Sequence, residues 1–265
     1  MCRLFCVLSK NKLNLSYYLL DAKYSILKQA EYEKQEDGWG LVIYNGRNPS
    51  FVIKSIKPVY EEKDRLKSII FDAKLALFFV RKASNPRGID KKLLMNIEAT
   101  QPFYFQNISF EHNGSIEIPD EIIQSLNFKH KPLSLNDSEV YFLCFLKFYE
   151  EEENVLKALK RTEEFIIKVF NETKSNKEKP YSSLNVIITD GNKVYALNKY
   201  LSNYKKSLID SDRDYYKMCY YTDEEKLIVA SEPIEEEGWK DLGNNKFLEG
   251  FVKDDKIYYT INEFI

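Results

Sequence analysis

The order of apolar patterns along this chain is the feature that most restricts its fold. Short apolar or alternating runs typical of strands occupy residues 2–8, 41–44, 51–56 and 75–80. Patterns of helical period fill the middle of the chain, and strand patterns return after residue 184. Strands first, helices in the middle and strands again indicate an α+β protein. We predict a four-layer αββα sandwich, in which helices cover the outer faces of two mainly antiparallel sheets.

Turn signals and helical periodicity place the remaining elements. Asn45-Gly46 and Asp190-Gly191-Asn192 each separate two apolar runs, and each predicts a β-hairpin. Residues 171–180 are polar and lysine-rich, and we expect a surface loop there because the strands beyond them are too few for an independent core. The other expected elements are helices at 16–34, 61–72, 137–149 and 155–170 and strands at 108–111, 184–189, 193–197, 215–222 and 226–230.

Length, charge and cysteine spacing limit the functions that this chain can have. We expect a single domain over residues 1–265, which is long enough for a sizeable core. The net charge of −2 argues against binding to nucleic acid or to an anionic membrane, and favours a small-molecule substrate. The sequence shows no signal peptide or bilayer-spanning apolar stretch, so we expect a cytoplasmic protein. The four cysteines lack CxxC spacing, which argues against a zinc site or a disulfide framework.

Cys2 directly follows the initiator Met1, so removal of Met1 would place a thiol and an α-amine on one residue. An α-amino group has an ordinary pKa of about 7.7 to 8.0, and can therefore act as a base toward its own side chain. The alternative is a buried strand cysteine, which position alone favours because free cysteine is among the most buried residue types. In a straight strand Cys6 would share a face with Cys2 about 13 Å away, too far for a disulfide.

Cys2 is followed by short motifs whose order is informative. The motifs are Asp37-Gly38-Trp39-Gly40, Val80-Arg81-Lys82-Ala83-Ser84, Gln101-Pro102-Phe103, His112-Asn113-Gly114 and Asn136-Asp137-Ser138-Glu139. In this order they resemble the class II glutamine amidotransferase domain, a family of N-terminal-nucleophile hydrolases. The later Val229-Ala230-Ser231-Glu232-Pro233 run, with Trp239 downstream, looks most like the stand-alone branch, which includes predicted amidotransferases and γ-glutamyl hydrolases. The resemblance covers the chain from Cys2 to about Trp239.

The resemblance implies a nucleophile and an oxyanion site. Cys2 would attack the side-chain amide of glutamine, and its own α-amine would carry the thiol proton to the departing ammonia, directly or through a water. The Asn113 side-chain amide and the Gly114 backbone N–H would stabilise the oxyanion of the tetrahedral intermediate. Taken alone, the Asn-Gly pair favours an ordinary hairpin turn. Its place among the other motifs favours the oxyanion site.

The resemblance also implies anchors for the two charged groups on the α-carbon of glutamine. Arg81, at the end of an apolar strand, would bind the α-carboxylate through its planar guanidinium, and Ser84 would add a hydroxyl to the same carboxylate. Asp137 would accept a hydrogen bond from the α-ammonium. The sequence from Asn136 to Glu139 is also typical of a helix N-cap, and the two roles can coexist.

The surroundings of Cys2 are less well defined by the sequence. Trp39 and Gly40 would form a wall of the site near Cys2, and a core tryptophan at the start of a hairpin is the alternative. Two positions depart from the family pattern: Phe79 stands where relatives usually have histidine, and Cys6 stands where they usually have glycine. Neither change removes a catalytic role, but both put the substrate preference in doubt.

Neither of the two histidines is expected to act as the catalytic base. His130 lies in a polar Lys-His-Lys-Pro stretch that is typical of a protein surface. His112 directly precedes Asn113 and Gly114, and we expect it to support that loop. The base that the resemblance implies for Cys2 is its own α-amine.

The resemblance implies hydrolysis of the glutamine side-chain amide through a γ-glutamyl thioester on Cys2, with no metal or organic cofactor. The chain has little room for a synthase domain, so ammonia would pass to a separate acceptor subunit; a homo-oligomer is compatible with the sequence. One alternative is a γ-glutamyl hydrolase that acts on a small peptide or thiol conjugate. An alternative of another class is an inactive binding or regulatory subunit, which would follow if Met1 is retained, because the Cys2 nitrogen would then be an amide.

Overall fold

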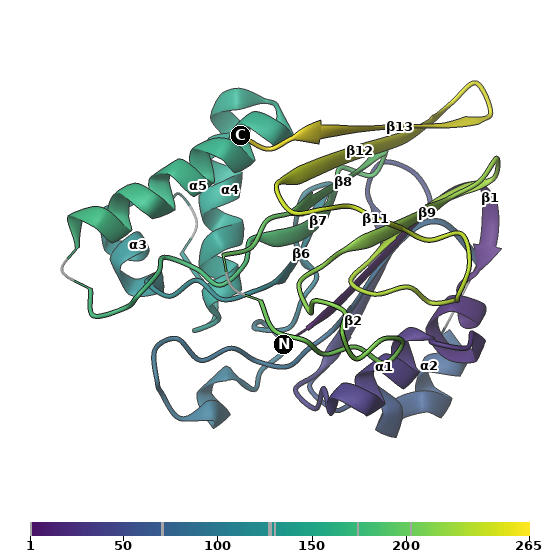
Figure 1. Ribbon diagram of the computed structural model, residues 1–265, viewed down its shortest axis with the longest axis horizontal. Helices are drawn as coiled ribbons and strands as arrows, with labels where there is room; N and C mark the ends of the chain where they lie inside the picture. Colours follow the sequence, from purple (N-terminus) through teal and green to yellow (C-terminus); the bar gives the residue numbers. More distant parts are fainter. Residues whose placement is uncertain (1, 70–71, 127–128, 130, 174, 202) are drawn as a thin grey trace.

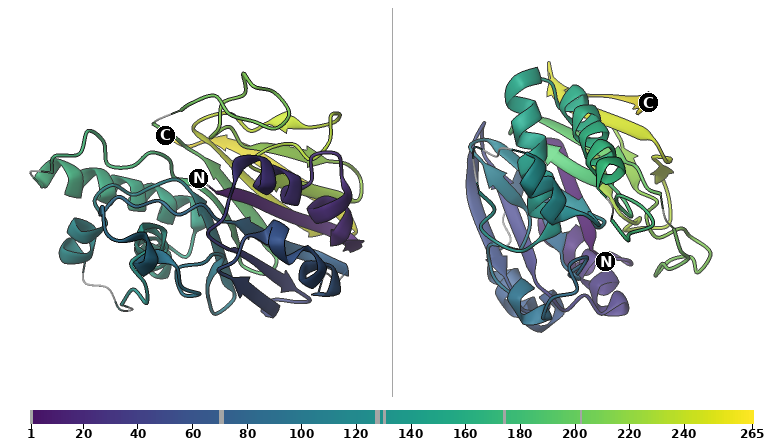
Figure 2. Two further views of the ribbon diagram at one scale, coloured as in Figure 1. Left: turned by 90° about the horizontal axis from the view of Figure 1, so that it is seen from below. Right: turned by 90° about the vertical axis from the view of Figure 1, so that its left-hand side faces the viewer.

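The computed structural model describes residues 2–69, 72–126, 129, 131–173, 175–201 and 203–265, which form the predicted two-sheet sandwich (Figures 1 and 2). All the strand pairs are antiparallel. The seven-stranded sheet has the order β11 (Lys240–Asp241), β9 (Cys219–Thr222), β10 (Lys226–Ala230), β1 (Arg3–Asn14), β4 (Asp72–Val80), β2 (Trp39–Tyr44) and β3 (Pro49–Ser55). The six-stranded sheet has the order β13 (Lys256–Glu263), β12 (Lys246–Lys253), β8 (Lys193–Asn198), β7 (Asn185–Thr189), β6 (Ile108–Asn113) and β5 (Phe103–Phe105).

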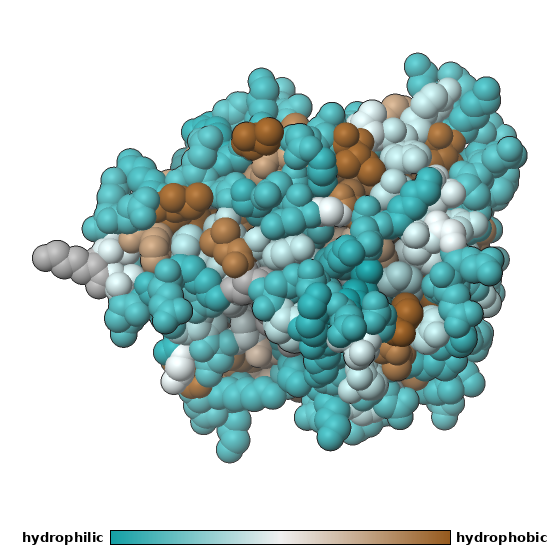
Figure 3. Space-filling model, viewed as in Figure 1, coloured by the Kyte–Doolittle hydropathy of each residue, from teal (hydrophilic) through white to brown (hydrophobic). Residues whose placement is uncertain are grey.

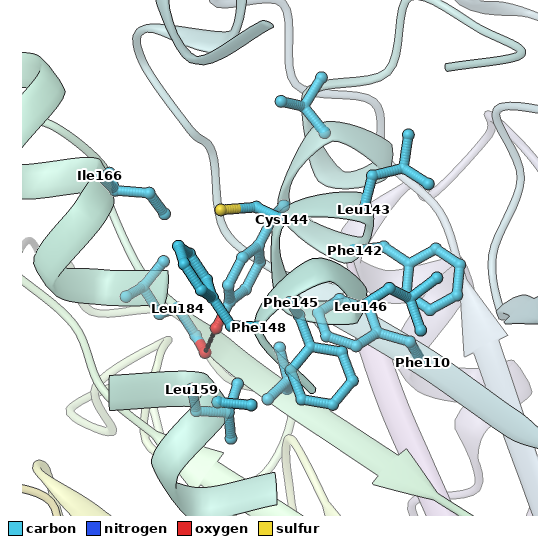
Figure 4. Packing of buried hydrophobic residues seen from close by; sticks show 14 of the residues in the cluster. Phe110, Phe142, Leu143, Cys144, Phe145, Leu146, Phe148, Leu159, Ile166 and Leu184 are labelled. Atoms are coloured by element: carbon cyan, nitrogen blue, oxygen red, sulfur yellow. Dashed lines mark hydrogen bonds between the residues drawn. The ribbon is translucent and has the colours of Figure 1, made fainter. Parts of the chain in front are cut away.

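Helices cover the outer face of each sheet, as the four-layer prediction requires. The six-stranded sheet packs against α3 (Pro119–Ser125), α4 (Asp137–Glu152) and α5 (Val155–Glu172). The seven-stranded sheet packs against α1 (Ile26–Glu33) and α2 (Lys63–Ile69). Figure 4 shows the first of these layers, in which α4 lies between α5 and β6 with most of its side chains buried. A third apolar layer fills the space between the two sheets.

The alternation of side chains along β1 decides which face Cys2 occupies. Leu4, Cys6 and Leu8 point into the layer between the sheets, while Phe5 and Val7 point toward the helices. Cys2 belongs to the same inner layer, which confirms that it shares a face with Cys6. All four cysteines are free thiols. The nucleophile predicted from the sequence therefore lies at the end of the inter-sheet core.

Two predicted helices are shorter and interrupted. Residues 16–34 form a π-helical turn (Tyr17–Asp21) and then α1, because the helical conformation is interrupted between Asp21 and Ser25. The Ser25 hydroxyl caps α1 by accepting from the Lys28 N–H. The helix expected over 61–72 is a 3₁₀ turn (Val59–Glu62) followed by α2, and β4 already begins at Asp72. Residues 70–71 lie outside the described part of the chain.

The last hairpin, β12–β13, is absent from the sequence prediction. Its turn residues Asp254 and Asp255 both adopt left-handed backbone angles, with φ of 49° and 55°. Such a turn is usually marked by Asn-Gly or Asp-Gly, and the Asp-Asp pair lacks that signal. Three short elements, β5, α3 and β11, were also not predicted.

The surface is mostly hydrophilic on the face shown in Figure 3, where apolar residues lie in separate small groups. Among the described residues, no helix has both the length and the apolar character needed to cross a membrane. The apolar residues of the longest helices, α4 and α5, instead face the six-stranded sheet and each other.

Candidate active site

Cys2 is held at the start of β1 by contacts from three other segments. Its backbone N–H donates to Asn113 Oδ1 at 3.1 Å, and its carbonyl accepts from the Tyr215 hydroxyl at 2.9 Å. Its Sγ lies 3.5 Å from the carbonyl oxygen of Lys82. Burial raises the pKa of the Cys2 thiol above its ordinary value, an effect that the nearby Arg81 guanidinium opposes. The thiol is therefore mainly protonated at neutral pH, and attack by its sulfur requires a base.

Asn113 contacts Cys2 with only one end of its side-chain amide. Its Oδ1 accepts from the Cys2 nitrogen, whereas its Nδ2 is buried and has no hydrogen-bond partner among the described residues. Leaving a buried donor unsatisfied costs about 1 to 3 kcal/mol, so such groups usually have a ligand or water to bind. A donor of this kind next to Cys2 is what the oxyanion of a tetrahedral intermediate requires.

Gly114 cannot carry a side chain in this structure. A Cβ atom there would lie 2.1 Å from the Ser183 carbonyl oxygen and 2.6 Å from His112 Nε2. The alternative of an Asn-Gly hairpin turn is wrong, because Asn113 ends β6 in register with Asn185 of β7 and Gly114 lacks the positive φ of such a turn. Gly114 therefore allows the chain after β6 to pass close to the segment before β7.

The Asn113 region is positioned by a residue whose role the sequence did not reveal. The Gln101 side chain accepts from the His112 N–H at 2.5 Å and donates to the His112 carbonyl at 3.2 Å. Both bonds fix the backbone directly before Asn113. Gln101 was part of a recognised motif, but the sequence does not indicate that its side-chain amide forms hydrogen bonds with the backbone of β6.

Arg81 is a buried cation that is held by neutral groups. Its side chain is 2 % exposed, and Nη1 donates to the carbonyl oxygens of Leu94 at 2.8 Å and Asp37 at 3.4 Å. It forms no ion pair with a carboxylate of the described residues, and burial lowers the pKa of its guanidinium. A buried charge without an opposite charge is costly, so this arrangement suits a site that receives an anion from a ligand.

Asp137 and Ser84 contact each other, which the sequence analysis did not predict. The Ser84 hydroxyl donates to Asp137 Oδ1 at 2.6 Å, and the Ile116 N–H donates to Asp137 Oδ2 at 2.8 Å. Asn136 is the N-cap of α4, since its Oδ1 accepts from the Ser138 N–H at 2.9 Å, so Asp137 is not needed for capping. Burial raises the pKa of the Asp137 carboxyl. Ser84 contacts Asp137 in this structure, and its predicted contact with a substrate carboxylate stays a prediction.

Trp39 does not lie where the sequence analysis placed it. Its ring packs in the apolar layer beneath α1 and α2, and its indole N–H donates to Glu62 Oε2 at 2.9 Å. Alternation along β2 puts this ring on the sheet face opposite Cys2. Trp39 is therefore a core tryptophan, the alternative given above, and does not form a wall of the site. Gly40 faces inward, where a Cβ atom would lie 2.2 Å from the Gln101 carbonyl oxygen. The lack of a side chain at Gly40 therefore leaves space for the backbone of Gln101.

The sequence analysis also missed the cluster that supports the backbone of Cys2. Arg3 lies 4.4 Å from the centre of the Tyr215 ring and forms ion pairs with Glu232 at 3.0 Å and Glu33 at 3.5 Å. Tyr215 in turn donates to the Cys2 carbonyl. A charged residue in an apolar strand signals that buried partners exist, but it does not identify them. Tyr215 was assigned to a strand, whereas β9 begins only at Cys219.

His112 supports the site as a neutral, buried residue. Its Nε2 donates to the Ser183 carbonyl at 2.9 Å, which leaves Nδ1 to accept from the Ser138 hydroxyl at 2.8 Å. Burial lowers the pKa of His112 to about 4. These contacts join β6 to α4 and to the segment before β7, in agreement with the expected supporting role. The expectation for His130 lies outside the described residues.

We predict a stability loss in acid that depends on His112. The unfolded chain binds the imidazole proton below pH 6.5, whereas the folded protein resists it until about pH 4. Stability is therefore complete above pH 6.5 and falls by about 3 kcal/mol as the pH drops to 4. Urea unfolding at several pH values measures the slope. A His112→Gln variant should show a flatter profile, and equal slopes in both proteins would contradict the assignment.

Among the described residues, no group of three or more His, Cys, Asp or Glu side chains could hold a metal ion. Within the part of the chain that the structure describes, the polar groups of the site instead offer one thiol, one unpartnered amide donor, one unpaired guanidinium and one buried carboxyl. Such a set can bind a zwitterion and stabilise the intermediate of an attack on a carbonyl carbon.

Comparisons with known proteins agree with this geometry. A model of the family "Glutamine amidotransferases class-II" matches residues 1–249. The fold is similar to that of a glutamine aminotransferase class-II domain protein from Silicibacter pomeroyi, with a TM-score of 0.63, 16 % identity and full coverage of both chains. A search of the curated proteins found no match.

Two further solved structures share the fold. Glutamine phosphoribosylpyrophosphate amidotransferase from Bacillus subtilis, complexed with ADP and GMP, has a TM-score of 0.64 and 15 % identity. The match covers all of this chain but 49 % of that protein. A predicted glutamine amidotransferase from Pseudomonas aeruginosa has a TM-score of 0.50 and 14 % identity, over 94 % of this chain and 96 % of that one.

Proposed function

This chain belongs to the class II glutamine amidotransferases, and on that premise we propose that it hydrolyses the side-chain amide of glutamine through a γ-glutamyl thioester on Cys2. The observation that carries the proposal is the Asn113 amide, which contacts the Cys2 nitrogen through Oδ1 and keeps a buried, unpartnered Nδ2 for an oxyanion. The proposal is also supported by the proximity of Cys2, Asn113 and Arg81, which come from separate segments: Asn113 contacts Cys2, and the charge of Arg81 acts on the Cys2 thiol.

The first half of the reaction uses the amine that removal of Met1 would free. The neutral amine accepts the thiol proton, and the thiolate attacks the γ-carbonyl carbon, whose oxygen takes the negative charge. Asn113 Nδ2 and the Gly114 N–H stabilise that oxygen. The amine then passes its proton to the amide nitrogen, the C–N bond breaks, and ammonia leaves the γ-glutamyl thioester behind.

The second half returns the enzyme to its starting state. A water molecule gives a proton to the Cys2 amine and attacks the thioester carbon, and the same donors stabilise the second oxyanion. The C–S bond breaks, the sulfur recovers the proton, and glutamate departs. In this scheme Asn113 Oδ1 orients the amine through the 3.1 Å contact, so one side chain serves both the base and the oxyanion. We propose that ammonia passes to a separate acceptor subunit.

Arg81 and Asp137 select the substrate by its α-carbon. The Arg81 guanidinium binds the α-carboxylate, which supplies the anion that the buried cation lacks. Asp137 binds the α-ammonium, and Ser84 holds the Asp137 carboxylate in place. These anchors do not contact the leaving group of the γ-amide. A γ-glutamyl peptide or thiol conjugate is therefore the second candidate substrate, because it carries the same α-carbon groups.

Glutamate release from purified protein tests the proposal. Intact-mass measurement first establishes whether Met1 is absent, and the enzyme is then offered glutamine, a γ-glutamyl dipeptide and a γ-glutamyl thiol conjugate at equal concentrations. We expect glutamine to be hydrolysed at least as fast as either conjugate. Faster release from a conjugate would favour the γ-glutamyl hydrolase. A mass that includes Met1, together with no release from any substrate, would favour a regulatory subunit.

A further inference from the structure

A cavity of about 810 Å³ lies at the open edge of the sandwich, between β3, β5 and α4. Its walls are mainly apolar and include Val52 of β3, Phe103 of β5 and, from α4, Phe142, Leu143 and Leu146. Figure 4 shows that the three α4 side chains lie on the side of that helix away from Leu159 and Ile166 of α5. Cys2, Arg81 and Asp137 do not line this cavity, so it is separate from the proposed active site.

One amine points into this apolar space. The half-buried Lys54 has its Nζ 5.7 Å from the centre of the Phe103 ring and 5.6 Å from that of Tyr104. Its Nζ has no hydrogen bond or ion pair with another described residue. Burial lowers the pKa of Lys54 to about 8, although the charges of Glu139 and Glu98 oppose the shift. Lys54 is thus still largely charged at neutral pH, with two aromatic faces as its neighbours.

The nearby carboxylates do not neutralise this amine. The two carboxylate oxygens of Glu139 accept hydrogen bonds from the Leu133 N–H at 2.7 Å and the Ser134 N–H at 2.8 Å. Glu98 is exposed and forms no ion pair with Lys54. Lys129 and Lys131 also line the cavity, and Lys129 is already paired with Glu150 at 3.1 Å. A ligand that brings a negative charge would supply the missing partner.

We propose that this cavity binds a small organic acid, with its apolar body against Phe103, Phe142 and Leu146 and its anionic group paired with Lys54. Pockets for small molecules usually measure about 300 to 1,000 Å³ and combine apolar walls with a few polar groups. This cavity has that size and that composition. A purely structural role would not require a cation here, because a hydrocarbon side chain at position 54 would pack against the same walls at no desolvation cost.

Two fluorescent probes that differ in charge test the proposal. 8-Anilinonaphthalene-1-sulfonate has an apolar body and an anionic group, and N-phenyl-1-naphthylamine has the same body without the sulfonate. We expect Lys54→Met to weaken binding of the sulfonate about tenfold or more, and to change binding of the neutral probe less than threefold. The control is Lys57→Met, which removes an exposed lysine three residues away and should leave both affinities unchanged.

A labelling experiment on the unaltered protein keeps the proposal testable if the Lys54 variant does not fold. Saturating sulfonate probe should slow reductive methylation of Lys54 at least fivefold, as measured by peptide mass spectrometry, while Lys57 reacts at its normal rate. Equal protection of both lysines, or unchanged sulfonate binding by a folded Lys54→Met protein, would overturn the proposal. Equal weakening of both probes by that variant would also overturn it, since the charge would then not be what binds.

Discussion

A Cys2→Ala variant is expected to release glutamate from glutamine at least about 10⁴-fold more slowly than the unaltered enzyme. Alanine is small enough for the contacts of the Cys2 backbone with Asn113 and Tyr215 to persist, so the loss should appear in kcat without a comparable loss of stability. A coupled assay for glutamate measures the rate, and thermal unfolding checks that the variant is folded.

Cys6→Ala is the matched control, because Cys6 lies on the same strand and the same inner face as Cys2. Its kcat should remain within tenfold of the unaltered enzyme. A glutamine-like electrophile such as 6-diazo-5-oxo-L-norleucine should add once to the unaltered protein and not to Cys2→Ala. Retained turnover in Cys2→Ala, or a label found on Cys6, would assign the nucleophile to another residue.

Removal of the oxyanion donor should have the second largest effect. Asn113→Ala is expected to lower kcat by about 10² to 10³-fold, since the loss of one such donor typically costs about 2.7 to 4 kcal/mol in the transition state. KM should change little, because Arg81 and Asp137, the proposed anchors of the α-carbon groups, are unaltered. Steady-state kinetics with glutamine separate the two parameters.

Asn113→Asp separates the two roles of this side chain. An aspartate keeps an oxygen to accept from the Cys2 nitrogen but replaces the Nδ2 donor by a second acceptor. If the donor matters most, Asn113→Asp should be no more active than Asn113→Ala. The control is Asn107→Ala directly before β6, where the side chain donates to the Asp190 carbonyl. If Asn113→Asp is nearly as active as the unaltered enzyme, the Nδ2 donor is not needed, and Asn113 only orients the Cys2 nitrogen through Oδ1.

The order of strand and helix patterns along the chain was enough to predict the layers of this fold, because each sheet must bury one face against the other sheet and one against helices. Gly46 and Gly191 have positive φ, which confirms the turns that their sequence signals predicted. The same rule could not find the turn at Asp254 and Asp255, where ordinary residues adopt the left-handed conformation through the pairing of β12 and β13. The strand pairing, and not an Asn-Gly or Asp-Gly turn signal in the local sequence, determines where this hairpin turns.

The candidate site was predictable to the extent that its residues stand in short, ordered motifs. Asn113, Arg81, Ser84 and Asp137 were named from such motifs, and the structure places Asn113 against Cys2 and Ser84 against Asp137. Tyr215 was missed because its hydroxyl reaches Cys2 across 213 positions of the sequence. Trp39 was misplaced because a motif shows which residues are near one another in the chain but not which sheet face each side chain occupies.

The place of β1 within its sheet has a consequence for how the protein is made. β1 pairs with β10, which lies far along the sequence, and Ala230 of β10 lies opposite Phe5. One edge of β1 therefore stays open until β10 is available, and pairings of such long range are slow to form. Such an open apolar edge is prone to pair with other chains. Because Cys2 directly precedes β1, we expect its surroundings to be completed late in folding.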